Sequence, residues 1–503
     1  MDHSAAQKFI DHAYENDIVP QLFDYIRIPN KSPAFDADWE RAGHMERAVR
    51  LIVDWCKAQP IEGLTVEVVR LPGRTPLIFM EVPGHAGEDT DDCVVLYGHL
   101  DKQPEMTGWL PELGPWEPVR KGEKLYGRGG ADDGYAAFAS LTALRLLQEQ
   151  GARRARCVVI IEACEESGSY DLPFYIDELQ DRIGTPSLVI ALDSGCGNYD
   201  QLWCTTSLRG ISGGNIRVDV LNEGVHSGDA SGIVPSSFRV LRTLLSRIED
   251  EATGRIKPKE FHQKIPAQRQ KQAKVAAKVL GKYLWQRFPW AEGTKPMAKE
   301  LSELVLNRTW RPYFEVIGVD GVPTTDKAGN VLRPYTTARL SLRVPPTADA
   351  AACVEHLRKI VTKNVPHGAK VTFEGEKAAD GWNAPELAPW LEKACERASQ
   401  QHFGKGCVYM GEGGTIPFMG MLGEKFPKAQ FLITGVLGPQ SNAHGPNEFL
   451  HLTMAKRLTA CVAQVIADHF VRNEKAAKKS GGAVAKAKAK TKGKAKAKDK
   501  AKR

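Results

Sequence analysis

Four short apolar runs of this chain each lead into an imidazole or a carboxylate. Residues 93–98 precede His99, 157–163 precede Glu165, 188–192 precede Asp193, and 430–437 precede the loop that holds His444. Amphipathic stretches with helical spacing, such as 136–150 and 172–181, lie between the runs. Strands that alternate with helices predict an α/β layer with a parallel or mixed sheet. Ligands of such sheets gather at the carboxyl ends of the strands, where these polar residues are expected.

A different pattern begins near residue 207 and predicts a second domain. Strands with alternating polarity are expected at 213–221, 313–319, 336–344 and 369–373, with helices at 235–251 and 348–362. The α/β pattern returns after residue 385, with helices at 386–401 and 452–471. We therefore predict a discontinuous domain (1–208 and 385–474) that is interrupted by an α+β domain (209–384).

The net charge of +7 comes from the end of the chain. Twelve Lys, one Arg and one Asp lie between Lys475 and Arg503, so the remainder carries a net charge of −5. A Lys/Ala-rich tail without aromatic residues cannot build a core, so we predict that 475–503 is disordered. The alternative role for this tail is non-specific contact with polyanions. A nucleic-acid-binding function of the protein would rest on this tail alone.

Cysteine usage and hydropathy favour a cytoplasmic protein. The ten cysteines contain no CxxC pair, which favours reduced thiols. No apolar run reaches the roughly 18 residues of a membrane span, and the start shows no secretory signal. We therefore expect no membrane partner.

The polar residues at the predicted strand ends suggest a metal site. His99 and Asp101 are two residues apart, Asp132-Asp133 closes the glycine-rich stretch 127–134, and Glu165-Glu166 follows an apolar run. Taken singly, each motif has an ordinary structural explanation. His99 could be a structural histidine, Asp132-Asp133 a helix cap, and Glu165-Glu166 part of a solvated loop. Together, these carboxylates would repel one another unless cations neutralise them.

The order of these motifs resembles the dinuclear metallopeptidase family of carnosinase, cytosolic nonspecific dipeptidase, aminoacylase and succinyl-diaminopimelate desuccinylase. The resemblance covers residues 10–472 and is nearest to the dipeptidase branch, through 98–104 and 413–417. It implies an α/β fold: a mixed-sheet metallopeptidase catalytic domain, discontinuous, with an inserted α+β lid and dimerisation domain.

The same resemblance implies two divalent metal ions per subunit. His99 and Asp193 would hold one ion, Glu166 and His444 the other, and Asp132 would bridge them. Zinc suits these donors, with manganese and cobalt as alternatives. Asp101 would orient His99, and Glu165 would be the general base. The bridging Asp132 would be followed by a cis peptide bond.

The inserted domain would contribute substrate-binding residues. His226 matches a histidine that reaches the active site of the partner subunit, which implies a homodimer. Arg343 matches an arginine that grips a substrate carboxylate, with backbone N–H groups at Gly414 and Thr415 beside it. The chain departs from the dipeptidase pattern at Gly411, where an arginine is common, and at Gly445-Pro446.

The predicted function is hydrolysis of the peptide bond of dipeptides or small peptides by a metal-bridged hydroxide, with a glutamate as general base. N-acyl-amino-acid deacylation or desuccinylation on the same scaffold is the alternative within the hydrolases. A non-catalytic binding protein is the alternative from another class, although this chain keeps all the implied ligands and the base.

Overall fold

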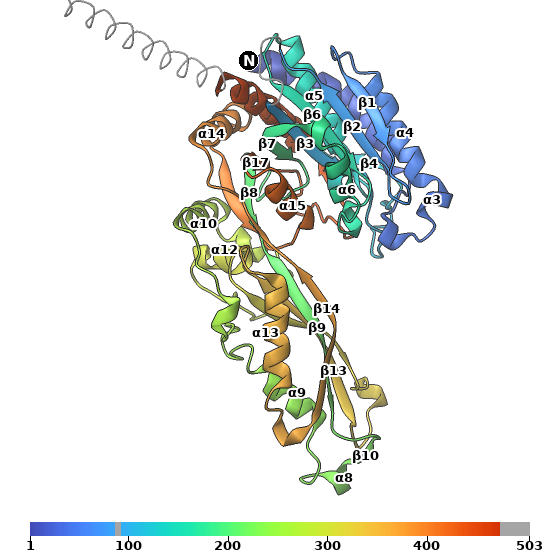
Figure 1. Ribbon diagram of the computed structural model, residues 1–503, viewed down its shortest axis with the longest axis vertical. Coiled ribbons are helices and arrows are strands. Elements are labelled where there is room, and N and C mark those ends of the chain that lie inside the picture. The colour runs from blue at the N-terminus through green and yellow to red at the C-terminus, as the bar shows by residue number, and fades with distance from the viewer. Residues whose placement is uncertain (86–91, 473–503) are drawn as a thin grey trace, which may run out of the picture. The chain divides into compact units, whose positions relative to one another are not determined.

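The structure is a computed structural model that describes residues 1–85 and 92–472 (Figure 1). The predicted disordered tail lies outside the described residues. The chain divides into two compact units: Met1–Leu202, Glu386–Cys407 and Lys428–Arg503 form the first, and Trp203–Pro385 with Val408–Pro427 form the second. The segment Val408–Pro427 therefore groups with the second unit, whereas the sequence analysis assigned it to the catalytic domain. The functions assigned to the two domains stay predictions.

A mixed sheet lies at the centre of the first unit. Its order is β1-β2-β6-β3-β7-β17, where the strands are β1 (Thr65–Val69), β2 (Leu77–Val82), β3 (Asp92–His99), β6 (Arg156–Glu162), β7 (Thr185–Ala191) and β17 (Gln430–Ile433). Strands β6, β3, β7 and β17 are parallel to one another. Strand β2 is antiparallel to β6, and the edge strand β1 is antiparallel to β2. The predicted mixed α/β architecture is confirmed.

The helices of the first unit bury this sheet. They are α1 (His3–Ala13), α2 (Val19–Ile26), α3 (Trp39–Ala42), α4 (His44–Lys57), α5 (Tyr135–Glu149), α6 (Leu172–Glu178), α7 (Gln180–Ile183), α14 (Pro389–Phe403) and a helix over 452–472. Helix α5 contacts β3 and β6, whose side chains are almost all buried. Because both faces of these strands are covered, their sequences read as continuous apolar runs.

Two elements of the first unit end earlier than expected. The predicted helix 172–181 is split into α6 and α7. Strand β17 ends at Ile433. Two residues later the chain passes so close to the segment after β7 that a Cβ on Gly435 would lie 2.0 Å from the Ser194 carbonyl oxygen. Three short strands that were not predicted, β4 (Val119–Lys121), β5 (Lys124–Tyr126) and β18 (Phe449–His451), form a sheet of the order β18-β5-β4.

The second unit contains an antiparallel sheet of the order β11-β13-β9-β14. Its strands are β9 (Gly210–Asp219), β11 (Tyr313–Asp320), β13 (Tyr335–Val344) and β14 (Lys370–Ala379). Helices α9 (Ser237–Leu245) and α13 (Ala350–Thr362) pack on it. Along β13 every second side chain is buried, among them Leu340 and Leu342, which join the core of this unit. Arg343 therefore lies on the opposite face from this core.

The second unit also contains strand β8 (Trp203–Leu208), further helices and a separate two-stranded sheet. Strand β8 pairs with β15 (Trp382–Asn383) and β16 (Val408–Glu412). The helices are α8 (Ser227–Ala230), α10 (Ala267–Leu280), α11 (Tyr283–Gln286), α12 (Leu301–Thr309) and α15 (Pro417–Lys425), and β10 (Val225–His226) pairs with β12 (Val331–Leu332). Within the described residues no helix has the length and apolar character that crossing a bilayer requires.

Candidate metal centre and substrate-binding residues

The residues predicted at strand ends meet at one edge of the sheet in the first unit. His99 is the last residue of β3, Glu165 and Glu166 follow β6 in the short turn Glu165–Ser167, and Asp193 lies just beyond β7. These three strands are parallel, so their carboxyl ends share an edge. Asp132 reaches the same place from the segment Gly130–Gly134, which precedes helix α5.

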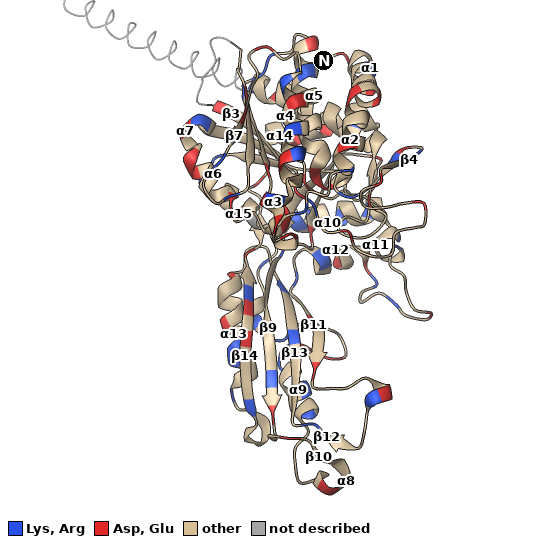
Figure 2. Ribbon diagram, turned by 90° about the vertical axis from the view of Figure 1, so that its right-hand side faces the viewer, with Lys and Arg blue, Asp and Glu red and all other residues tan. Residues whose placement is uncertain are grey.

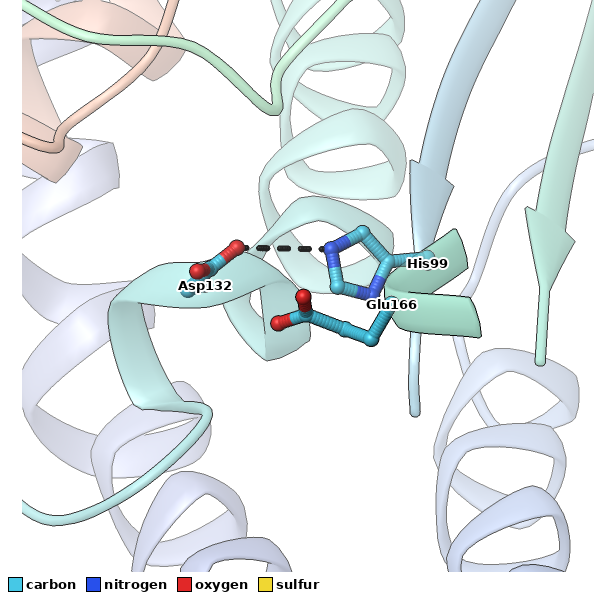
Figure 3. A group of neighbouring side chains, drawn as sticks. All are labelled: His99, Asp132 and Glu166. Carbon is cyan, nitrogen blue, oxygen red and sulfur yellow. Dashed lines mark ion pairs between the residues drawn. The ribbon is translucent and has the colours of Figure 1, made fainter. Parts of the chain in front are cut away.

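Asp132 lies between two imidazoles. Its Oδ1 is 3.4 Å from His99 Nε2, and its Oδ2 is 3.1 Å from His444 Nε2. His99 Nε2 also lies 3.8 Å from Asp193 Oδ2, and His444 Nε2 lies 3.3 Å from Glu166 Oε2. Figure 3 shows His99, Asp132 and Glu166 pointing toward one another from separate elements. The structure thus brings together all five predicted metal ligands.

Three atoms of this cluster are suited to binding a cation. His99 Nε2, Asp132 Oδ2 and Glu166 Oε1 are buried without a hydrogen-bond partner among the described residues. Leaving a buried polar atom unsatisfied costs free energy, which a bound cation would offset. Ligand atoms of His99, Asp132 and Glu166 lie within 4.8 Å of one another, as do those of His99, Glu165 and Asp193. Imidazole and carboxylate donors at this spacing suit divalent metal ions.

The electrostatics of the cluster also reflect uncompensated negative charge. Burial, together with Asp193, raises the pKa of the Glu165 carboxyl well above its ordinary value. Burial and the nearby Asp132 do the same to the pKa of Glu166. Burial opposes the protonation of His99, but Asp101 and Asp132 beside it raise its pKa well above the ordinary value. A cation in the centre would favour ionised carboxylates and neutral imidazoles, which are the forms that bind metals.

Asp101 holds the turn that carries the two glutamates. Its carboxylate accepts hydrogen bonds from the backbone N–H groups of Glu165 (3.1 Å) and Glu166 (3.0 Å). The Nδ1 atom of His99 is 3.1 Å from the carbonyl oxygen of Asp101 and 3.4 Å from its carboxylate. One residue therefore links the ends of β3 and β6. The resemblance implied only the contact with His99.

The cis peptide bond between Asp132 and Asp133 that the resemblance implied is present. Asp133 is fully buried, and its Oδ2 accepts a hydrogen bond from the backbone N–H of His99 (3.2 Å). Gly98 permits this close approach, because a Cβ there would lie 2.6 Å from the same oxygen. The paired Asp132-Asp133 motif thus supplies one side chain to the cluster and a second that fixes the end of β3.

A buried ion pair that the sequence analysis did not assign holds the loop of His444. The His444 side chain is 57% exposed, and its loop contains four non-glycine residues with positive φ: Gln440, Asn442, His444 and Asn447. Arg128 Nη1 lies 2.5 Å from Glu448 Oε2, and both side chains are buried. Arg128 also donates to the carbonyl oxygens of Gly445 (2.8 Å) and Pro104 (3.1 Å). Arg128 thereby connects the loops that carry His99, Asp132 and His444.

Replacing Arg128 with methionine is expected to weaken metal binding about 10- to 100-fold, because partners that orient metal ligands typically have effects of this size. Metal content after dialysis against a competing chelator measures the effect, with circular dichroism as the check on folding. Arg120→Met is the matched control, since it breaks an exposed pair with Glu15. Unchanged metal affinity in a folded Arg128→Met protein would contradict this positioning role.

The predicted substrate-binding residues lie in the second unit. Arg343 Nη1 donates to Thr415 Oγ1 (3.2 Å), and that hydroxyl donates to the carbonyl oxygen of Arg209 (2.5 Å). Gly414 is exposed beside Thr415. The structure thus brings Arg343, Gly414 and Thr415 together.

His226 lies in a separate two-stranded sheet, β10-β12, also in the second unit. It is exposed on β10 and pairs with Val331, which precedes β13. Arg343 is near the end of β13, eight residues beyond Tyr335, and the pairing of β13 with β9 is continuous between them. At about 3.4 Å per residue this separation is about 27 Å, so the structure does not bring His226 to Arg343 within one chain.

Three comparisons place the chain among known proteins. The model of peptidase family M20/M25/M40 matches residues 95–468. A cysteinylglycine-S-conjugate dipeptidase of Corynebacterium striatum is 29% identical over 427 residues, which cover 80% of this chain and 87% of that protein. The beta-Ala-His dipeptidase of Homo sapiens is 25% identical over 380 residues, or 71% of this chain and 70% of that protein.

The solved structure of the dipeptidase Dug1p from Saccharomyces cerevisiae has a TM-score of 0.69 with 19% sequence identity, covering 93% of this chain and 99% of that one. This likeness supports the fold. The family match spans most of the chain, from the strand that ends at His99 to the C-terminal helix. The chain belongs to peptidase family M20/M25/M40.

Proposed function

We propose that this protein is a metal-dependent dipeptidase. The observation that carries the proposal is the cluster in which Asp132 lies between His99 and His444 while buried donor atoms lack hydrogen-bond partners. Family membership makes the chain a metallopeptidase-type hydrolase, and two relatives with detectable sequence identity are named as dipeptidases.

We assign His99 and Asp193 to one divalent metal ion, Glu166 and His444 to a second, and Asp132 to both. The mixture of imidazole and carboxylate donors favours zinc, with manganese and cobalt as alternatives. When bound, such ions lower the pKa of a coordinated water and polarise the peptide carbonyl.

Glu165 is the proposed proton carrier. Its carboxylate lies beside His99 and Asp193 at the candidate metal centre, where it would accept a proton from the attacking water and return it to the leaving amine. Asp101 fixes its backbone through the N–H of Glu165, so the carboxylate is oriented before the substrate arrives. Arg343, with Gly414 and Thr415, is assigned to the substrate carboxylate, since a guanidinium matches the planar shape of that group.

A substrate panel tests the function and separates it from the alternative. Purified protein, loaded with zinc or manganese and analysed for metal content, is assayed with dipeptides and with N-acetyl and N-succinyl amino acids. Faster turnover of dipeptides supports the proposal. Selective turnover of the N-acyl substrates would replace it by the deacylase function, and no turnover of either class would favour the non-catalytic alternative.

We further propose a cytoplasmic location. All ten cysteines are free and buried, which fits a reducing compartment.

A homodimer is the proposed functional form. If His226 and Arg343 serve the same substrate, a separation of about 27 Å along β13 is too long for one chain, since a dipeptide spans only about 7 Å. A second copy would then supply His226. A two-fold interface pairs one surface with itself, so each subunit would complete the site of its partner.

Mixing two inactive variants is expected to restore activity if His226 acts across the dimer. His226→Ala alone should lower kcat about 10²- to 10³-fold, the typical loss for one donor to a developing oxyanion. Mixed dimers of His226→Ala and Glu165→Gln contain one site in which both residues are intact. The measurement is dipeptide hydrolysis after subunit exchange, which mass spectrometry of differently tagged subunits verifies. Exchange without recovered activity would show that His226 does not act in the partner's site.

A further inference from the structure

Three arginines surround the turn Gly413–Thr415 in the second unit. Arg343 Nη1 donates to Thr415 Oγ1 (3.2 Å), and Arg209 Nε donates to the Gly413 carbonyl oxygen (3.3 Å). A Cβ atom on Gly413 would lie 3.2 Å from Arg209 Nη2 and 3.4 Å from the Cγ of Arg308. The turn carries the backbone and hydroxyl groups that we assign to the substrate carboxylate.

Within the part of the chain that the structure describes, none of these guanidinium groups forms an ion pair. The hydrogen bonds of Arg209 go to the backbone carbonyl oxygens of Gly413, Asn307 and Arg311, which leave its charge uncompensated. Arg308 makes no side-chain hydrogen bond to a described residue. Glu412 is the acidic group that acts on Arg308, and its Oε1 accepts a hydrogen bond from Thr205 (2.9 Å). The cluster therefore has an excess of positive charge.

This excess is unfavourable in the free protein. Burial and the charges of Arg343 and Arg308 lower the pKa of Arg209 to about 10. Burial also lowers the pKa values of Arg308 and Arg343. Partly buried guanidinium groups are stabilised when a carboxylate arrives, and the resulting charge-assisted hydrogen bonds are among the strongest in proteins.

Helix α12 explains how Arg308 reaches the turn. A Cβ atom on Gly411 would lie 2.3 Å from Ser207 Oγ on β8 and 3.0 Å from the Cβ of Thr309 on α12, so these two elements leave no room for a side chain at this position of β16. Arg308 is the residue before Thr309 on the same helix. Figure 2 shows basic segments on α10 and α12, which belong to the insert between α9 and β11. The segment between α9 and β11 thus places the positive charge of Arg308 next to strand β16, which has no positive charge of its own.

We propose that Arg308 and the Nη2 group of Arg209 bind a second carboxylate beside the one assigned to Arg343. The preferred substrates would then be dipeptides whose carboxyl-terminal residue is aspartate or glutamate, since such a residue presents an α-carboxylate and a side-chain carboxylate together. This inference rests on the proposed dipeptidase function and specifies its substrate class.

The test compares isosteric substrates on the metal-loaded, full-length protein. We expect kcat/KM to be at least about 10-fold higher for Ala-Asp and Ala-Glu than for Ala-Asn and Ala-Gln, mainly through KM. Arg308→Gln should lower kcat/KM for the acidic pair about 10- to 100-fold, as expected for loss of a hydrogen bond between charged groups, and affect the neutral pair much less. Arg308→Lys keeps the charge and should retain part of the preference.

Lys278→Gln is the control, because it removes an exposed positive charge from the neighbouring helix α10 and should leave the ratio unchanged. Equal turnover of acidic and neutral dipeptides would overturn the specificity and leave the dipeptidase function standing. An equal loss for both pairs in Arg308→Gln would show that Arg308 has only a structural role. No hydrolysis of any of the four dipeptides would contradict the proposed function itself.

Discussion

Glu165→Gln is expected to lower kcat for dipeptides about 10²- to 10⁴-fold while both metal ions stay bound, because the amide keeps the shape of the side chain but cannot accept a proton. The backbone N–H of Glu165 donates to Asp101, and the substitution leaves this hydrogen bond intact. Steady-state kinetics and metal analysis of the same preparation measure the two effects. Glu178→Gln, the same change at an exposed position of α6, is the control.

Metal content decides between two roles for Glu165. Its carboxylate lies near enough to His99 and Asp193 for all three to hold one ion. The resemblance makes Glu165 a base and Glu166 a ligand. Loss of one metal equivalent in Glu165→Gln would show that Glu165 binds metal, and retained metal with near-normal kcat would exclude it as the base.

The sheet of the first unit was predictable because its central strands are buried, and burial requires apolar side chains along their whole length. Strands β3, β6 and β7 are covered on both faces and read as apolar runs, so their positions were found to within a few residues. Strands β4, β5 and β18 have three residues each, too few to show a period. Helix α9 ends at Leu245, six residues before the predicted end, since the chain turns there to pair Glu249 with Ile256.

The candidate site was predictable to the extent that its residues follow strands. Each proposed ligand stands next to an apolar run or a glycine-rich turn, and parallel pairing brings those positions together. Arg128 lies in the glycine-rich stretch 127–134, but it is 320 residues from Glu448, and only the fold shows that the two side chains pair. Arg308 lies in the basic, helix-rich segment between α9 and β11. The composition of this segment does not indicate that one of its arginines lies next to the turn at Gly413.

Removing the metal ions is expected to abolish hydrolysis and to lower the temperature of unfolding. Ions that bind only the folded protein stabilise it by about 2.7 kcal/mol at a hundred times their Kd. Exhaustive chelation followed by zinc or manganese add-back is followed by activity and by differential scanning calorimetry. Full activity after verified removal of both ions would contradict the proposed mechanism.

The stabilisation by metal should increase as the pH rises above the ordinary pKa values of glutamate (4.5) and histidine (6.5). In the metal-free cluster the pKa values of Glu165, Glu166 and His99 lie above their ordinary values. Such groups stabilise the metal-free fold when protonated, and this contribution is lost as pH rises toward their folded pKa values. The pKa of Asp132 is lowered instead, so its contribution to the stability of the metal-free fold has the opposite sign. That contribution changes only at a pH below this range. Metal binding requires the deprotonated carboxylates and strengthens over the same range. The difference in unfolding temperature between the loaded and metal-free protein should therefore widen toward pH 8, and a difference independent of pH would place the bound ions outside this cluster.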